Sequence, residues 1–124
     1  MPERIEPREA ALACAEIAYE KKATDILILD VEKILVITSY FVLASGESRK
    51  QLQAIADSIN QRLKPHGCRR IGTEGYDDGK WILLDYGDII VQLFDRETRN
   101  YYNLEMIWGD APRVPFVPKG LKAS

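Results

Sequence analysis

The sequence predicts a single α/β domain in which helices flank a mixed sheet of about five strands. The chain has 124 residues, which is enough for one hydrophobic core and short for two. Two stretches, residues 7–22 and 48–63, place apolar side chains at helical spacing. Short β-branched and aromatic runs of strand length lie between and after them. Helical and strand patterns that alternate along one chain indicate an α/β architecture.

The first expected element is a helix from Pro7 to about Lys22. Proline suits the first turn of a helix, where its missing N–H is not needed. Apolar and acidic residues then separate onto two arcs, so that one side of the helix can face a core. The apolar arc holds Ala11, Leu12, Cys14, Ala15, Ala18 and Tyr19, and the acidic arc holds Glu9, Glu16 and Glu20.

Strands are expected after this helix. Residues 25–31 and 34–38 are apolar and rich in β-branched side chains, and Glu32 with Lys33 is typical of a turn between them. Residues 40–44 continue as a further strand. Apolar runs of this length are far too short to cross a membrane.

A second helix should begin at Ser48. Ser48 and Gln51 have the spacing of a capping box, in which both side chains bond free amides of the first turn. The helix is expected to end near Pro65 and Gly67, because proline cannot continue it and glycine suits its end. Residues 69–74 are more polar and predict a short strand near a sheet edge. The apolar stripe of this helix is Leu52, Ile55, Ala56, Ile59 and Leu63.

Residues 81–94 predict a β-hairpin. Apolar and outward-facing positions alternate in its first strand, a turn follows, and residues 89–94 form a β-branched second strand. The charged residues that follow predict one or two turns of helix at a sheet edge. In the first strand Ile82, Leu84 and Tyr86 alternate with Trp81, Leu83 and Asp85, and the turn is Gly87 and Asp88.

The domain is expected to span residues 1–111, followed by a tail over residues 112–124. The tail contains three prolines and two lysines. Such a segment is expected to be extended and mobile.

Composition argues against several protein classes. The chain is 46% hydrophobic and 29% charged, as in an ordinary globular protein. Residues 1–10 lack the apolar centre of a secretory signal and carry acidic residues that transit peptides avoid. Cys14 and Cys68 have neither metal-binding spacing nor the number that a disulfide scaffold needs, so a reducing cytoplasm is the expected location. The net charge of -2 argues against a domain that grips nucleic acid mainly by neutralising phosphates.

Ordered blocks of residues from 41 to 108 carry a family pattern. They are Phe-Val-Leu-Ala-Ser-Gly-x-Ser at 41–48, Ala-Ile-Ala-Asp at 54–57, Glu-Gly at 74–75, Trp-Ile-Leu-Leu-Asp-x-Gly-Asp at 81–88, Ile-Val-x-x-Phe at 90–94 and Glu-x-Arg-x-x-Tyr-x-Leu-Glu-x-x-Trp at 97–108. In this order they resemble the Iojap family, the ribosomal silencing factors. The resemblance extends over nearly the whole chain, from about residue 8 to residue 112.

The resemblance implies a binding protein and no enzyme. Iojap-family proteins attach to the large ribosomal subunit through the universal ribosomal protein numbered fourteen, at the face where the subunits join. Their bulk keeps the small subunit from docking, which represses translation when nutrients run short. For this chain the resemblance therefore implies no cofactor, no metal and no membrane, little or no direct contact with nucleic acid, and a possible homodimer when free.

The expected partner-binding residues lie on the hairpin and on the segment after it. Aromatic residues and arginine are the types enriched at the centres of protein interfaces. Trp81 and Tyr102 are the expected main contacts, and Arg99 is expected to shape the segment or supply a polar rim. The alternative for each aromatic residue is a place in the core. The full expected set is Trp81, Leu84, Arg99, Tyr102, Leu104, Glu105 and Trp108.

Two positions depart from the family pattern. Ser39 stands where the family commonly has an aspartate before the strand aromatic, and Gln92 stands where it often has a histidine. A function that depended on titration of that histidine would be lost here. A surface that docks by shape and apolar contact would be retained.

The resemblance also implies a sheet related to the nucleotidyltransferase fold, which raises an enzyme as the main alternative. Such an enzyme needs a Gly-Ser turn that holds triphosphate, followed by closely spaced carboxylates that bind two metal ions. Gly46 and Ser48 could form the turn, but Asp30 and Glu32 precede it and Asp57 stands alone after it. We therefore expect a nucleotidyltransferase-like sheet without the catalytic carboxylates.

Other candidate catalytic residues are few. Asp85 and Asp88 flank the hairpin turn, where aspartate commonly bonds nearby amides. His66 is the one histidine, and its place beside a helix-ending proline and glycine predicts a surface residue. A third interpretation is a generic dimeric interaction module, because an exposed aromatic surface tends to find a partner.

Overall fold

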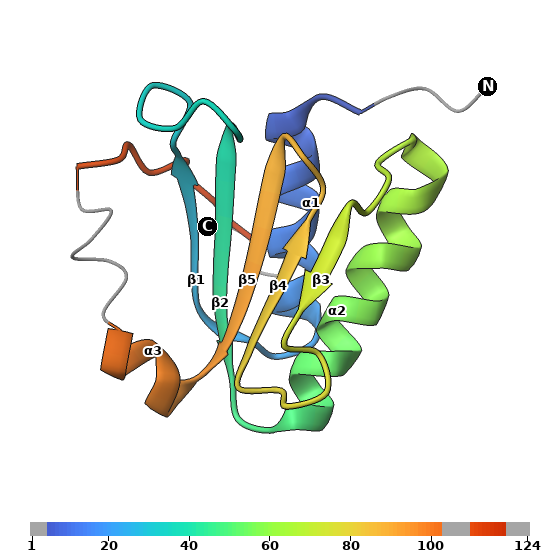
Figure 1. The fold of residues 1–124 in the computed structure, drawn as a ribbon, viewed down its shortest axis with the longest axis vertical. Helices are drawn as coiled ribbons and strands as arrows, with labels where there is room; N and C mark the ends of the chain where they lie inside the picture. Colours follow the sequence, from blue (N-terminus) through green and yellow to red (C-terminus); the bar gives the residue numbers. More distant parts are fainter. Residues whose placement is uncertain (1–4, 103–109, 119–124) are drawn as a thin grey trace.

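The computed structural model describes residues 5–102 and 110–118. Within them, helices pack on a five-stranded sheet of order β1-β2-β5-β4-β3 (Figure 1). This is the α/β domain with a mixed sheet that the sequence predicts. In chain order the elements are α1 (Pro7–Glu20), β1 (Thr24–Asp30), β2 (Tyr40–Gly46), α2 (Arg49–Leu63), a 3-10 turn (Lys64–His66), β3 (Gly72–Glu74), β4 (Trp81–Asp85), β5 (Ile89–Asp95) and α3 (Arg96–Tyr102).

The centre of the sheet is the parallel pair β2 and β5, and the outer pairs are antiparallel. All of β2 from Phe41 to Gly46 is buried. A strand that is covered on both faces has a nearly continuous apolar sequence, which explains the Phe-Val-Leu-Ala run. β3 is short and lies at the edge, as its polar sequence predicts.

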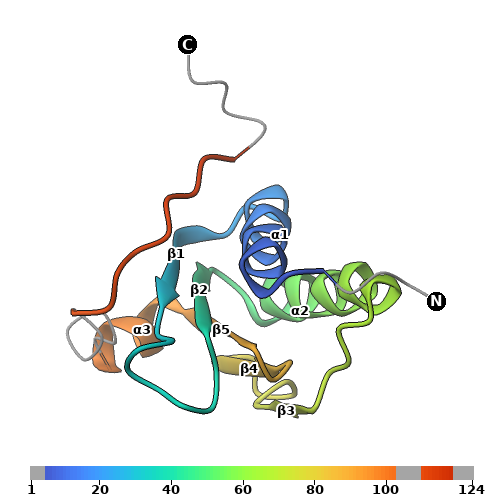
Figure 2. The same ribbon diagram turned by 90° about the horizontal axis from the view of Figure 1, so that it is seen from above.

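Helices α1 and α2 lie together on one side of the sheet (Figure 2). We call this side the covered face. The alanines of α1 have small side chains, which let the helix lie close to the strands. The covered face buries Ile28, Val42, Ala44, Ile82, Leu84, Val91 and Leu93 from the strands against Ala11, Cys14, Ala15, Ala18, Leu52, Ile55, Ala56 and Ile59 from the helices.

The start of α2 confirms the predicted cap by Ser48, while Gln51 bonds the amide of the residue before that cap. The Ser48 Oγ accepts a hydrogen bond of 3.1 Å from the amide of Gln51, and the Gln51 side chain accepts one of 2.7 Å from the amide of Glu47. After the 3-10 turn, Gly67 has a φ of 77°, the left-handed conformation that ends many helices.

The predicted hairpin of β4 and β5 is also confirmed. Its turn is closed by the Tyr86 amide, which donates to the Ile89 carbonyl at 3.0 Å. The Asp85 side chain accepts a hydrogen bond of 2.8 Å from the amide of Gly87, whose φ is 85°. Asp85 is thus a turn-making residue, as expected.

The strand expected over residues 34–38 is absent, because this segment forms the connection between β1 and β2. The two strands pair in antiparallel fashion, with Asp30 opposite Tyr40, so the chain must reverse between them. The amides of Ile34 and Leu35 both donate to the Val31 carbonyl, at 2.9 and 2.8 Å. β-Branched residues favour strands, but the tertiary pairing overrides that preference here.

The segment expected to start a mobile tail pairs with β1 instead. The Asp30 amide donates to the Pro112 carbonyl at 2.8 Å, and the Val114 amide donates to the Ile28 carbonyl at 2.9 Å. The Val114 side chain is buried against the covered-face core. Residues 119–124 of the expected tail lie outside the described residues. Among the described helices, none has the length and apolar character that crossing a membrane requires.

Candidate functional site

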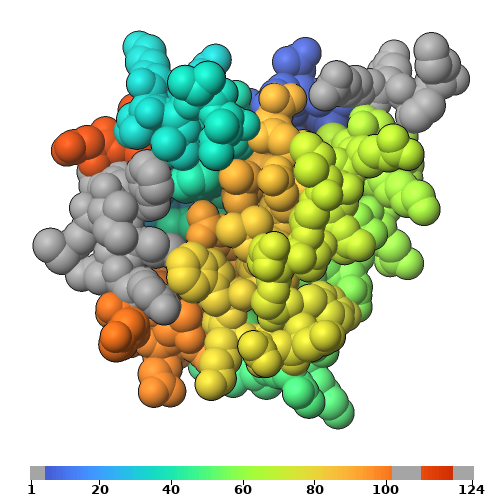
Figure 3. Space-filling view, viewed as in Figure 1, coloured from blue at the N-terminus to red at the C-terminus, as the bar shows by residue number. Residues whose placement is uncertain are grey.

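The side of the sheet opposite α1 and α2 carries the candidate site. We call it the open face. Figure 3 looks onto this side, where atoms of β4 and β5 reach the surface between the loop of residues 31–39 and α3. Strand pairing assigns to the open face Leu27, Leu29, Phe41, Leu43, Ser45, Trp81, Leu83, Ile90, Gln92 and Phe94.

Strand β4 contributes alternate residues to the two faces, as its sequence predicts. Ile82 and Leu84 are fully buried in the covered-face core. Trp81 and Leu83 point the other way and are only partly buried. The expectation that Leu84 contacts a partner is therefore not met, because α1 and α2 cover its side of the strand. Leu83 is the residue of β4 that the open face presents beside Trp81.

A ring contact and a hydrogen bond help to hold Trp81 in one orientation. Its ring packs on Phe94 with 5.2 Å between ring centroids and 36° between planes. Its Nε1–H donates a hydrogen bond of 3.2 Å to the Gln92 Oε1. Indole nitrogen is only a donor, so the glutamine must present its oxygen here. The Trp81 side chain is thus held in place while part of its surface remains accessible to solvent.

Gln92, which stands where the family often has a histidine, has a defined role in this site. The side chain is 6% exposed and serves as the acceptor for Trp81. A glutamine amide does not titrate, so this hydrogen bond persists across the physiological pH range. The orientation of Trp81 therefore does not depend on a histidine.

Arg99 attaches α3 to the sheet. The amide of Thr98 donates a 2.7 Å hydrogen bond to the Asp95 side chain, which stabilises the start of this helix. One turn after Asp95, the Arg99 Nη1 donates to the Ser45 Oγ at 2.9 Å, and the Arg99 side chain is buried. The sequence predicted Arg99 to shape the segment or to form a polar rim, and its burial assigns it the first of these roles.

The remaining predicted contacts follow Arg99 in the chain. Tyr102 is the last residue of α3, and its side chain lies outside the part of the chain that the structure describes. The same holds for Leu104, Glu105 and Trp108. The structure therefore positions Trp81, Leu84 and Arg99 and leaves Tyr102, Leu104, Glu105 and Trp108 as predicted contacts.

Four exposed apolar residues near the open face were not predicted as contacts. Tyr101 on α3 is 81% exposed. In the loop of residues 31–39, Ile34, Val36 and Ile37 are 47%, 104% and 77% exposed. Solvent-exposed clusters of large apolar residues mark interaction surfaces. A sequence signal for the loop exists in its adjacent Glu32 and Lys33, which predict a turn, but the apolar run itself resembles a buried strand.

A comparison with protein families decides the assignment. The family model described as "Ribosomal silencing factor during starvation" matches residues 4–124. The chain belongs to the ribosomal silencing factor family. The resemblance that the sequence blocks carry is thereby confirmed.

Named relatives in this family cover most of the chain. The ribosomal silencing factor RsfS of Bacillus subtilis is 45% identical over 103 residues, which are 83% of this chain and 84% of that protein. The protein Iojap of Arabidopsis thaliana chloroplasts is 34% identical over 107 residues, 84% of this chain and 43% of the relative. A mouse relative, 33% identical over 92 residues (72% of this chain, 40% of its own), is named mitochondrial assembly of ribosomal large subunit protein 1.

Solved structures agree with the fold. A crystal structure of a Chromobacterium violaceum protein matches with a TM-score of 0.81 and 31% identity, covering 95% of this chain and 98% of that one. A Bacillus halodurans protein matches with a TM-score of 0.73 and 32% identity, covering 88% and 96%.

In this silencing-factor chain, the residues weighed for nucleotide transfer have structural roles. A side chain at Gly46 would come within 2.7 Å of the Leu52 side chain, so the glycine permits the tight passage from β2 to α2. Ser48 caps α2, and the Asp30 Oδ1 accepts a 3.1 Å hydrogen bond from the Glu32 amide. Among the described residues, no group of three or more His, Cys, Asp or Glu side chains is arranged to hold a metal ion.

Among the described residues, the titratable groups whose pKa clearly shifts lie in the covered-face core or pack against it. Burial raises the pKa of the Cys14 thiol and of the Tyr86 hydroxyl. A hydrogen bond to Asp57 raises the pKa of Tyr76. A buried thiol with a raised pKa is a poor nucleophile.

Proposed function

We propose that this protein binds the large ribosomal subunit through its open face and α3, and so represses translation. The proposed contact is the universal ribosomal protein numbered fourteen, at the surface where the small subunit joins. The bound protein would block subunit joining by its bulk when nutrients are limiting. The proposed location of this activity is the cytoplasm.

The observation that carries the proposal is the state of Trp81. A tryptophan that is partly accessible and already fixed by Phe94 and Gln92 loses little side-chain entropy on binding. Pre-oriented aromatic residues of this kind are typical interface hot spots. Leu83 and Ile90 extend the partly buried apolar surface beside it.

The second part of the proposed contact is α3 and the segment after it. Tyr101 exposes most of its side chain on this helix, and Tyr102, Leu104, Glu105 and Trp108 follow. We propose that these residues bind the partner together with Trp81. Arg99 supports them indirectly, because its bond to Ser45 fixes the angle at which α3 leaves the sheet.

Self-association of the free protein is a further part of the proposal. The exposed side chains of Ile34, Val36 and Ile37 favour it, since apolar loops in water tend to associate. Sedimentation equilibrium should detect a dimer in the free protein, and Val36→Ser with Ile37→Ser should shift it toward monomer. A wild type that stays monomeric at high concentration would remove this part of the proposal.

Co-sedimentation with purified ribosomal subunits tests the main proposal. The protein should pellet with large subunits and not with small subunits, and it should lower the yield of joined ribosomes when added before mixing. Tyr101→Ala should reduce both effects, while Gln61→Ala on the exposed side of α2 should leave them unchanged. Recovery of the wild-type protein in the free fraction at every salt concentration would refute the proposal.

A further inference from the structure

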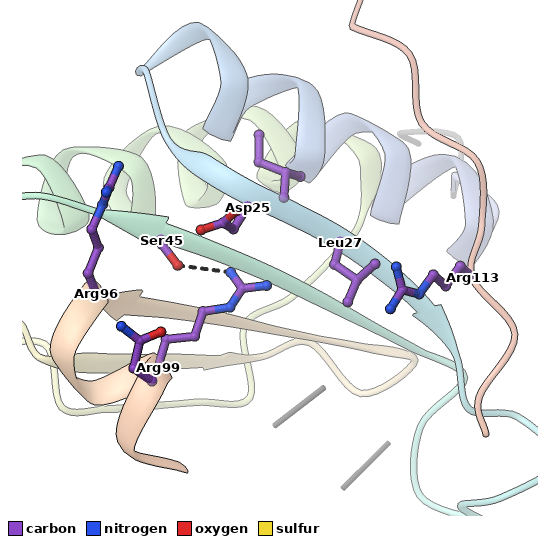
Figure 4. Close-up of a pocket in the computed structure, with 8 residues that line it drawn as sticks. Asp25, Leu27, Ser45, Arg96, Arg99 and Arg113 are labelled. Atoms are coloured by element: carbon purple, nitrogen blue, oxygen red, sulfur yellow. Dashed lines mark hydrogen bonds between the residues drawn. The ribbon is translucent and has the colours of Figure 1, made fainter. Parts of the chain in front are cut away.

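A basic cavity lies at the end of the sheet where β1, β2 and α3 meet. Its volume is about 560 Å³, within the usual range for small-molecule sites. Four separate segments of the chain contribute to its walls (Figure 4). The lining residues that matter here are Asp25, Leu27, Ser45, Arg96, Arg99 and Arg113.

Two guanidinium groups enter the cavity from different elements. Arg99 reaches in from α3 and bonds the Ser45 Oγ at 2.9 Å. Arg113 reaches in from the segment that pairs with β1, and Figure 4 shows the two guanidinium groups pointing toward one another with Leu27 between them. No ion pair of Arg113 occurs among the described residues. The cavity thus holds a supported arginine and an arginine with open hydrogen-bonding capacity.

A β-bulge in β1 helps to form the cavity. The pairing of β1 with β2 shifts register between Thr24 and Leu27. Asp25 within the bulge has a φ of 50°, a conformation that aspartate tolerates better than most residues. Bulges re-aim neighbouring side chains and are common beside binding sites. Here the bulge lies beside Ser45, where the cavity is lined by both strands.

The charge of the described lining is positive. Arg96, Arg99 and Arg113 contribute three positive charges, and Asp25 contributes the one carboxylate. Arg96 is partly neutralised by an exposed ion pair of 3.2 Å with Glu47. Arginine forks bind phosphate oxygens in pairs, and the Ser45 hydroxyl adds a hydrogen-bonding group.

We propose that this cavity binds a polyphosphate-bearing small molecule of nucleotide size, without a bridging metal ion. Arg99 and Arg113 approach from different sides, which suits an anion with more than one phosphate. Leu27 offers an apolar wall for the rest of the ligand. A single carboxylate, Asp25, is too few to hold a metal ion by itself.

The proposed ligand site adjoins the proposed ribosome contact and shares α3 with it, and its ligand binding is tested without ribosomes. Ser45 in the cavity pairs across the sheet with Phe94, and Phe94 pairs with Trp81. The cavity therefore lies at one end of the open face. A bound anion would join α3 to the segment of Arg113.

Isothermal titration with tripolyphosphate, and separately with ATP, tests the site on the full-length protein. Both should bind in the absence of Mg²⁺, and added Mg²⁺ should not strengthen the binding. Arg113→Ala should weaken it about tenfold, the effect of losing one strong charge-assisted hydrogen bond. Arg113→Lys should lie between, because lysine keeps the charge and loses the fork.

The controls separate this site from other sources of binding. The pairing of Arg113 with β1 is made by backbone, so Arg113→Ala should retain the wild-type melting temperature. Arg8→Ala removes an exposed arginine of α1 outside the cavity and should bind like the wild type. Absence of binding at millimolar ligand, binding that requires Mg²⁺, or equal affinity in Arg113→Ala would each overturn the proposal. So would binding of an RNA oligonucleotide at this site with no binding of tripolyphosphate.

Discussion

The two faces of the sheet use alternate residues of the same strand in different ways. On the covered face, Ile82 and Leu84 are fully buried beneath the helices. On the open face, Trp81 and Leu83 are only partly buried, and Trp81 is oriented by its bond to Gln92. Both faces bury apolar side chains, Leu43 and Phe94 among them on the open face, and the open face adds an oriented, partly accessible aromatic and a polar acceptor. One strand thus separates the residues that stabilise the fold from those that the proposal assigns to recognition.

The largest expected effect is a loss of stability from a substitution in the covered face. Leu84→Ala should lower the free energy of unfolding by about 2–5 kcal/mol, because it removes buried methyl groups and leaves a cavity. The matched variant Leu83→Ala should lower it by about 1 kcal/mol or less, because its side chain is already partly in water. Urea unfolding measures both. Equal losses in the two variants would contradict the difference between the faces.

The next effect concerns the open face itself. Trp81→Ala should weaken binding to large subunits by about 2 kcal/mol, or about thirtyfold, because it removes a central aromatic anchor. Trp81→Phe should keep the ring packing on Phe94 and lose less affinity. Affinity and thermal melting should be measured on the same samples. If Trp81→Ala binds weakly only at temperatures where it is partly unfolded, Trp81 is a core residue and has no contact role.

A smaller effect should follow from removing the acceptor of Trp81. Gln92→Leu leaves the indole N–H without its partner, which should cost about 1 kcal/mol of stability. Affinity for the large subunit should also fall, because Trp81 loses a hydrogen bond that helps to orient it. Gln61→Leu on the outer side of α2 is the control. Unchanged melting and unchanged affinity in Gln92→Leu would show that the bond does not orient Trp81.

The smallest effect is confined to alkaline solution. Burial raises the pKa of Tyr86 above its ordinary value of 10.0. The folded state therefore favours the neutral hydroxyl. The contribution of this group to the free energy of unfolding is fully present below about pH 10 and is lost as the pH rises further. Tyr86→Phe should lose less stability than the wild type between about pH 10 and pH 12. Parallel curves for the two proteins would exclude this contribution.

The sequence predicted most of the covered face correctly. The apolar stripe of α2, its capping by Ser48, and the alternation in β4 are local patterns with a direct physical meaning. Each depends on residues close in the chain. The family and the fold class are confirmed for the same reason, since many such patterns occur in one order.

The open face was predicted less well because its details depend on long-range pairing. The loop of residues 31–39 has a strand-like composition, and only the pairing of Asp30 with Tyr40 turns it into a connection. Pro112 cannot donate a hydrogen bond, yet its carbonyl accepts one from Asp30, so a proline-rich tail segment can pair with an edge strand.

Two side chains show the same limit at the level of the site. Arg99 is charged and was open to a surface role, but its bond to Ser45, 54 residues away in the chain, accompanies its burial. Leu84 follows the predicted alternation, yet the resemblance alone did not indicate which face of the strand meets a partner. The strand register and the positions of the helices supply that information.

The central claim is that the open face, and not the covered side of the molecule, binds the large subunit. A matched pair of charge insertions tests it: Leu83→Glu on the open face and Ala54→Glu on the exposed surface of α2. Affinity for purified large subunits should be measured for both variants after their melting temperatures have been compared. The account predicts strongly reduced binding for Leu83→Glu and wild-type binding for Ala54→Glu. Wild-type binding by a folded Leu83→Glu variant, or loss of binding in Ala54→Glu alone, would contradict it.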